Sequence, residues 1–182
     1  MSAEDDPDKA RRFRDAALAH LDDVYTLARY LLRDQVDAED AVQECYLRAF
    51  QHIDSYRGPA MKPWLLAILR NVCRAEFARR AQAPAGECGD EQGAAGPPLW
   101  QEPQQSPEAE FIRARDGDTI RRLIAALPPP FREAVVLRDI NNLSYREIAE
   151  VAGVPVGTVM SRLARARAML RAAWNVEEGP TP

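Results

Sequence analysis

Arginines and hydroxyl side chains lie close together near the C-terminal end of the sequence, in GVPVGTVMSRLARARAML, residues 153–170. An arginine can donate two hydrogen bonds to one guanine, and it can also neutralise a backbone phosphate. A hydroxyl can bond either a base edge or a phosphate. The pattern indicates contact with DNA, with a merely solvated basic helix face as the alternative. The residues concerned are Thr158, Ser161, Arg162, Arg165 and Arg167.

A second basic cluster lies in residues 57–80, which carry six basic residues and a single acid, Glu76. A basic groove with stacking rings is how proteins hold single-stranded nucleic acid. Trp64, at a predicted helix start, is equally expected in the core. The basic residues are Arg57, Lys62, Arg70, Arg74, Arg79 and Arg80, and the aromatic residues among them are Tyr56, Trp64 and Phe77.

The preceding segment has the opposite charge. Residues 33–54 contain six acids and two arginines, so this face repels a nucleic acid duplex. It is either a plain solvated helix or a surface for docking a protein. The residue types alone favour the solvated helix.

Metal and nucleophilic chemistry have little support in the sequence. Cys45, Cys73 and Cys88 form no C-x-x-C pair, and neither His20 nor His52 has a ligand partner nearby in the sequence. We expect two buried thiols and one loop thiol, with no metal site, no cofactor and no enzymatic activity.

The elements that position these groups are predicted to be helices. Apolar residues recur at helical spacing along most of the chain, and no alternating strand pattern occurs. The fold class is therefore all-α. Asp37 is a predicted helix N-cap, Pro63 suits the first turn of a helix, and Val135, Val136 and Leu137 are assigned to one helix.

Residues 144–170 fit a helix-turn-helix. Ser144 and Glu147 form a capping box, which begins a helix. Ala149 is small enough for a second helix to approach, Gly153 can take the left-handed backbone that ends a helix, and Val159 lies ten residues after Ala149. This spacing predicts two helices, the second of which carries the arginines outward.

Charge and composition divide the chain into three parts. Residues 81–118 hold eight acids and two basic residues, whereas residues 119–182 hold nine basic residues and six acids. Loss of apolar periodicity with enriched Pro, Gly and Gln predicts a flexible linker. We expect a helical domain at 13–80, an acidic Pro/Gly-rich linker at 81–115 and a helix-turn-helix domain at 116–174.

The sequence contains no apolar stretch of the ~20 residues that cross a bilayer. Its first residues, MSAEDDPDKARR, are polar and have no signal-peptide core. We therefore expect a cytoplasmic protein without membrane insertion.

Three segments resemble an extracytoplasmic-function (ECF) sigma factor of bacterial RNA polymerase, in the sigma-70 family. DAEDAVQECYLRAF is similar to the polymerase-binding helix of the family. YRGPAMKPWLLAILRNVCRAEFARR is similar to the segment that recognises and melts the minus-ten element. LPPPFREAVVLRDINNLSYREIAEVAGVPVGTVMSRLARARAML is similar to the module that reads the minus-thirty-five element.

The resemblance implies partners and roles. One partner would be core RNA polymerase, contacted at the clamp helices of its largest subunit and at its flap. The others would be promoter DNA, both duplex and single-stranded, and an anti-sigma factor. Residues 55–62 would hold a flipped base, and the linker would thread toward the active-site and RNA-exit channels. Polymerase would be bound by Asp37, Asp40, Gln43 and Glu44. The minus-ten DNA would be faced by Arg70, Asn71 and Arg74, and the upstream element by Thr158, Ser161, Arg162 and Arg165.

Two positions depart from the family pattern, since most members carry Lys where Met160 stands and many carry Asp where Ala75 stands.

Two other classes of function stay open on the residues alone. A stand-alone helix-turn-helix regulator would bind a palindrome as a dimer, yet no evident dimerisation helix follows Leu170. A nucleic-acid enzyme would need a convergent His, Cys or acid cluster.

Overall fold

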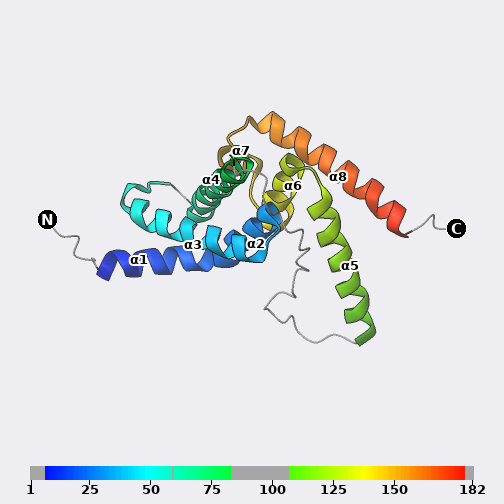
Figure 1. Cartoon of the computed structure of the whole chain (residues 1–182), viewed down its shortest axis with the longest axis horizontal. Coiled ribbons are helices and arrows are strands. Elements are labelled where there is room, and N and C mark those ends of the chain that lie inside the picture. Colours follow the sequence, from blue (N-terminus) through cyan, green and yellow to red (C-terminus); the bar gives the residue numbers. More distant parts are fainter. Residues whose placement is uncertain (1–6, 59, 83–106, 179–182) are drawn as a thin grey trace.

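The structure is a computed structural model of the chain, and it describes residues 7–58, 60–82 and 107–178. Every regular element in these ranges is a helix, so the all-α prediction is confirmed (Figure 1). In chain order the elements are α1 (Pro7–Ala17), η1 (Leu18–His20), α2 (Leu21–Leu32), α3 (Gln35–His52), η2 (Ile53–Ser55), α4 (Met61–Gln82), α5 (Pro107–Ala126), α6 (Pro129–Val135), η3 (Val136–Ile140), α7 (Tyr145–Ala152) and α8 (Val156–Glu178).

The N-terminal helices pack around a shared apolar centre. Helices α2, α3 and α4 contact one another, and α1 lies against this group. The buried positions of α3 recur at helical spacing, and Leu65, Leu69 and Val72 of α4 are buried as well; those of α3 are Ala38, Ala41, Val42, Cys45 and Ala49. The Cys45 thiol donates to the carbonyl of Leu65 at 3.4 Å, which ties α3 to the first turns of α4.

The start of α3 differs from the prediction. Arg33 takes a left-handed conformation that ends α2, and the helix cap is Asp34, whose side chain accepts from the Asp37 backbone N–H at 2.9 Å. The assignment of Asp37 as N-cap is therefore wrong, because the chain reverses at Arg33 and the next residue already caps α3. Asp37 lies in the first turn instead.

The C-terminal helices contain one departure from regular α geometry. Helix α6 ends at Val135, and residues Val136–Ile140 form a π-helical turn, so Val136 and Leu137 do not continue an α-helix as predicted. The backbone N–H of Asn141 donates to the Val136 carbonyl at 2.9 Å, which closes the wider ring of this turn. The extra residue in the turn places Asn141 in the interior, where it is buried.

The helix-turn-helix has the predicted local geometry. Ser144 and Glu147 form both bonds of the capping box, which begins α7. Gly153 has φ +63°, the left-handed backbone expected at a C-cap, and its N–H bonds the Ala149 carbonyl. Helix α8 follows after Pro155 and packs against α6 and α7.

The N-terminal and C-terminal helices share one continuous core. Helix α7 packs on α4, and α6 packs on α2 (Figure 1). Helices α5 and α8 extend from this body on the side away from α1. Helices reach into both ends of the predicted linker, since α4 ends at Gln82 and α5 begins at Pro107. The predictions for residues 83–106, Cys88 included, lie outside the described residues.

Candidate functional site

Helix α8 presents one buried and one exposed face. Val159, Leu163 and Ala166 are buried against α6 and α7, as their spacing predicts. On the opposite side Ser161 and Arg165 are exposed, while Thr158 and Arg162 are partly buried at its margins. The Ser161 hydroxyl donates to the Thr158 carbonyl at 3.0 Å. The exposed guanidinium of Arg165 can donate to a DNA groove, whereas the Ser161 hydroxyl, whose proton is engaged, can accept a hydrogen bond there.

Arg167 differs from the other arginines of α8. Its Nη2 lies 2.6 Å from Oδ1 of Asp139 in the π-helical turn, about 200° around the helix from Arg165 at 100° per residue. The sequence predicts that Arg167 contacts DNA, and in this structure its guanidinium pairs with Asp139 and so links α8 to η3. Met160, at which most family members carry Lys, is 54% exposed on α8 and so adds apolar surface there.

The loop before α4 is organised by an aromatic pair. The rings of Tyr56 and Trp64 lie 4.8 Å apart at 41°, and Trp64 packs against the core. A Cβ on Gly58 would come within 2.9 Å of the Tyr56 ring, so glycine lets the ring lie on the loop backbone. Burial raises the pKa of Tyr56. The contacts of Tyr56 with Gly58 and Trp64 hold a partly exposed aromatic surface beside α4.

The predicted DNA-facing cations of α4 and its loop are not equally available. Arg57 donates from Nη1 to the Asp54 carbonyl at 2.5 Å and the Tyr56 carbonyl at 3.0 Å. Lys62 pairs with Asp23 at 2.9 Å. Asn71 and Arg74 are exposed, whereas Arg70 is paired with Glu133 of α6 and its side chain is only 14% exposed.

A cavity of about 420 Å³ lies beside this loop and was not predicted. Its cations are Lys9 and Arg12 of α1 and Arg57 of the loop, and Asp54 is its acid, paired with Lys9 at 2.6 Å. The hydrogen bond from Lys9 holds the pKa of Asp54 below its ordinary value. The basic run KARRFR at the start of α1 was the signal for it in the sequence. The cavity brings cations of α1 together with Arg57 of the loop.

The exposed face of α3 combines polar and apolar side chains. Asp40 and Gln43 are exposed, and Glu44 is paired with Arg48 on the same helix at 2.5 Å. Val36 and Leu47 are 65% and 59% exposed, and at 100° per residue they share a stripe with Asp40 and Gln43. Sequence reasoning missed the exposure of these two apolar residues.

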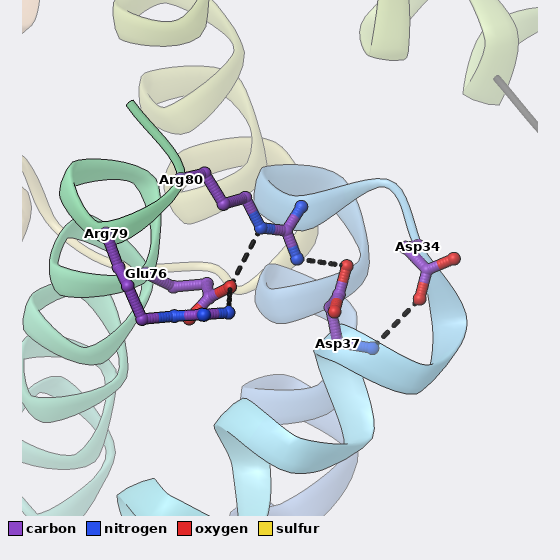
Figure 2. A network of polar contacts seen from close by, with 5 residues as sticks. All are labelled: Asp34, Asp37, Glu76, Arg79 and Arg80. Carbon is purple, nitrogen blue, oxygen red and sulfur yellow. Dashed lines mark hydrogen bonds and ion pairs between the residues drawn. The ribbon is translucent and has the colours of Figure 1, made fainter. Parts of the chain in front are cut away.

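Asp37 has a different environment from Asp40. Figure 2 shows it pointing at Arg80, with which it forms an ion pair that joins the start of α3 to the end of α4. Glu76 completes the network, since it accepts from Arg80 at 2.8 Å and from both Nε and Nη2 of Arg79. The hydrogen bonds from Arg79 and then Arg80 lower the pKa of Glu76 to about 2. Asp37 is thus engaged within the chain.

The described residues contain no group of three side chains that could hold a metal ion. Cys45 and Cys73 are buried as predicted, and burial raises the pKa of each thiol to about 12, which keeps both protonated and unreactive. No helix in the described part of the chain is long and apolar enough to cross a membrane.

Comparison with known families supports two adjacent modules. Residues 17–83 match the sequence model described as sigma-70 region 2, and residues 117–170 match the one described as sigma-70, region 4. The chain is 38% identical over 155 residues to the ECF RNA polymerase sigma factor SigE of Mycolicibacterium smegmatis, covering 84% of this chain and 57% of that protein. It is 34% identical over 165 residues to the ECF RNA polymerase sigma factor EcfG of Rhodopseudomonas palustris, covering 90% of this chain and 86% of that protein.

Two solved structures share the overall arrangement. The sigma factor RpoE of Bartonella quintana, in complex with the anti-sigma factor NepR, superposes with a TM-score of 0.69 at 27% identity, over 91% of this chain and 98% of that one. CnrH, in complex with the cytosolic domain of CnrY, has a TM-score of 0.62 at 24% identity over 92% of this chain and 90% of that one, which shows the same fold.

Proposed function

Because the chain belongs to the ECF sigma factors of the sigma-70 family, it is a transcription initiation factor that directs RNA polymerase to promoters, and we propose which of its surfaces carry out each step. The observation that carries the assignment is the presence of regions 2 and 4, in this order, in one chain. The stand-alone helix-turn-helix regulator is not favoured, because it does not explain why residues 17–83 match sigma-70 region 2.

The exposed stripe of α3 is the proposed docking surface for core polymerase. It offers Asp40 and Gln43 as polar partners and Val36 and Leu47 as apolar ones. Apolar residues ringed by polar groups are the usual composition of a protein interface. Glu44 flanks the stripe, and Asp37 supports it indirectly, since its pair with Arg80 fixes where α3 begins.

The basic side of α4 and its loop is the proposed surface for the opened minus-ten strand. Asn71 and Arg74 are exposed there, and the Tyr56–Trp64 pair offers a partly exposed ring surface for stacking. Arg70 belongs to the same surface by position, although Glu133 holds it in this structure. The cavity lined by Lys9 and Arg12 lies next to the loop and adds cationic groups for phosphate.

The outer face of α8 is the proposed reader of the minus-thirty-five duplex. Arg165 and Ser161 stand clear of the protein, and Thr158 and Arg162 border them. A recognition helix reads bases with a few such side chains while others contact phosphates. Arg167 is left out of this surface, because Asp139 holds it.

An anti-sigma protein is a further proposed partner. RpoE, with 27% identity and a similar arrangement over 91% of this chain, is bound to an anti-sigma factor in its own crystal. We place the chain in the bacterial cytoplasm, where core polymerase works. Proteins of this family act as transcription factors, and we assign no catalytic step to this chain.

Polymerase binding tests the assignment of α3. We expect the double substitution Asp40→Arg with Glu44→Arg to weaken binding of the chain to core polymerase at least ~30-fold, because like charges across an interface cost several kcal/mol. Binding is measured by fluorescence anisotropy of labelled chain titrated with core enzyme. Glu150→Arg is the control for a single charge reversal, since it reverses an exposed acid on α7, and Asp40→Arg alone is compared with it at equal net charge. Equal affinity of the α3 variant and this control would contradict the docking surface.

A further inference from the structure

The first turn of α3 has little apolar contact with the rest of the chain. Helix α2 ends at Arg33, whose φ is +66°, and α3 begins two residues later, at Gln35. Residues 33–36 are exposed, and Ala38 is the first buried residue of α3. Because an alanine buries little surface, this turn depends on polar bonds more than on packing.

Two kinds of polar contact hold the turn. The Asp34 side chain accepts from the Asp37 backbone N–H at 2.9 Å, and the Asp34 carbonyl accepts from the Ala38 backbone N–H at 3.2 Å. The carboxylate of Asp37 in turn points at Arg80, in the last turn of α4, and pairs with it (Figure 2). The bonds of Asp34 lie within α3, whereas the pair ties the turn to a different helix.

The guanidinium of Arg80 is held from two sides. Its Nη2 faces Oδ2 of Asp37, and its Nε donates to Oε1 of Glu76, four residues earlier on α4, at 2.8 Å. Hydrogen bonds with Asp37 and then with Glu76 raise the pKa of Arg80, so the guanidinium keeps its charge. A side chain that one neighbour orients toward another is suited to fix the second neighbour in place. Glu76 therefore aims Arg80 at the start of α3.

The pair also suits the two helix ends that it joins. Helices α3 and α4 run antiparallel, since Cys45 contacts Leu65 near the start of α4 whereas Asp37 contacts Arg80 near its end. An acid in the first turn of a helix and a base in the last turn each oppose the partial charge of that helix end. Each charge is thus favoured where it lies, and the pair joins the two ends.

The turn held in this way carries the first residue of the docking stripe. Val36 is exposed and lies between the cap, Asp34, and Asp37. Asp40 follows one turn later on the same stripe. When the first turn frays, Val36 leaves the stripe, and the apparent affinity for a partner of the whole stripe falls with the fraction of chains that keep the turn ordered.

We propose that Arg80 is a positioning residue for polymerase docking, which acts by holding Asp37 and with it the first turn of α3. Asp37 then contributes to docking through Arg80 and not by touching polymerase. This inference rests on the proposed function of α3 and assigns a task to an arginine outside the docking stripe.

The test measures the affinity of the full chain for core polymerase by fluorescence anisotropy, without DNA. We expect Arg80→Gln and Asp37→Asn each to weaken binding about three- to fivefold, near the upper value for a partly exposed ion pair. The double variant should weaken it by the same factor, because both substitutions remove one interaction. Arg79→Gln is the matched control, since it removes the same charge from the neighbouring residue, which bonds Glu76. It should leave the affinity within about twofold of wild type.

A charge reversal separates the indirect role of Asp37 from a direct contact with polymerase. Asp37→Arg sets two arginines against each other and should weaken binding more than Asp37→Asn does. Adding Arg80→Asp restores an opposite pair and should recover most of the loss, although the reversed charges suit the two helix ends less well. A direct contact predicts no recovery, because the polymerase would still meet an arginine at position 37.

Amide hydrogen exchange of the free full-length chain reports on the turn itself. The backbone N–H groups of Asp37 and Ala38, both bonded to Asp34, should exchange faster in Arg80→Gln than in Arg79→Gln. The urea midpoints of these two variants should agree, because each loses one exposed arginine and no core contact.

Three results would overturn the proposal. The first is equal polymerase affinity of Arg80→Gln and Arg79→Gln. The second is a charge reversal without recovery, which would mean that Asp37 touches polymerase itself. The third is weaker binding of Arg80→Gln with unchanged exchange in the first turn, which would mean that Arg80 touches polymerase. In each case the proposed docking surface stands if Asp40→Arg with Glu44→Arg still weakens binding, and it fails only if that variant binds normally, so the two failures can be told apart.

Discussion

Replacing Arg165 with alanine should weaken base discrimination at the upstream element without weakening the fold. The side chain is exposed on the outer face of α8 and buries no core surface. Loss of one good arginine–base contact costs ~1–3 kcal/mol of discrimination, which corresponds to about 5- to 150-fold. An exposed substitution of this kind changes the free energy of unfolding by no more than ~0.5 kcal/mol.

Arg167→Ala is the matched comparison, because it removes the same side chain from the same helix. Arg167 is 2.6 Å from Asp139, in a pair whose side chains are 43% and 39% exposed. Pairs this exposed contribute ~0–1 kcal/mol to stability. Arg167→Ala should therefore lower the free energy of unfolding slightly and leave the preference among base pairs unchanged.

The assay measures anisotropy of the reconstituted holoenzyme on duplexes that carry a selected upstream element or a single mismatch within it. The ratio of the two dissociation constants is compared between the variants, and urea unfolding of the free chain gives stability. If Arg167→Ala relaxes the ratio as much as Arg165→Ala does, the assignment of the outer face of α8 is refuted.

Three further predictions concern stability and affinity. Gly153→Ala should lower the free energy of unfolding by ~1–2 kcal/mol in urea titrations, because the residue has φ +63° and a Cβ there meets no atom within 4 Å, so only backbone strain acts; an unchanged urea midpoint would contradict this. The pKa of Glu76 is lowered from 4.5 to about 2, so its contribution to stability is present above pH 4.5 and is lost as the pH falls toward 2; Glu76→Gln should flatten this acid dependence, and an unaltered pH profile would argue against the network. Met160→Lys should steepen the salt dependence of duplex binding by about 0.9 through one added phosphate contact, and an identical slope would place Met160 away from the DNA.

Local signals made the helix-turn-helix predictable. Ser144, Glu147 and Gly153 act within a few residues of their own positions, so their types alone determine where α7 begins and ends. The N-cap of α3 was predicted at Asp37 and lies three residues earlier, at Asp34. The error arose because α2 ends at Arg33 in a left-handed conformation, and arginine is not a residue type that indicates such a conformation.

Contacts distant in sequence left no such signal. The pair of Arg70 with Glu133 depends on how α4 and α6 meet, and neither residue type nor spacing specifies that. The burial of Asn141 depends on the π-helical turn before it, which the apolar run VVL did not indicate. The exposure of Val36 and Leu47 follows from which face of α3 meets α4, and only the packed structure reveals it.

Transcription in vitro with core RNA polymerase on a fragmented genomic library, with start sites mapped by sequencing, tests directly whether the chain directs promoter choice. We expect the intact chain to produce new transcripts whose starts share an upstream and a minus-ten element, and Asp40→Arg with Glu44→Arg to remove them. Identical start sites with and without the intact chain would contradict it.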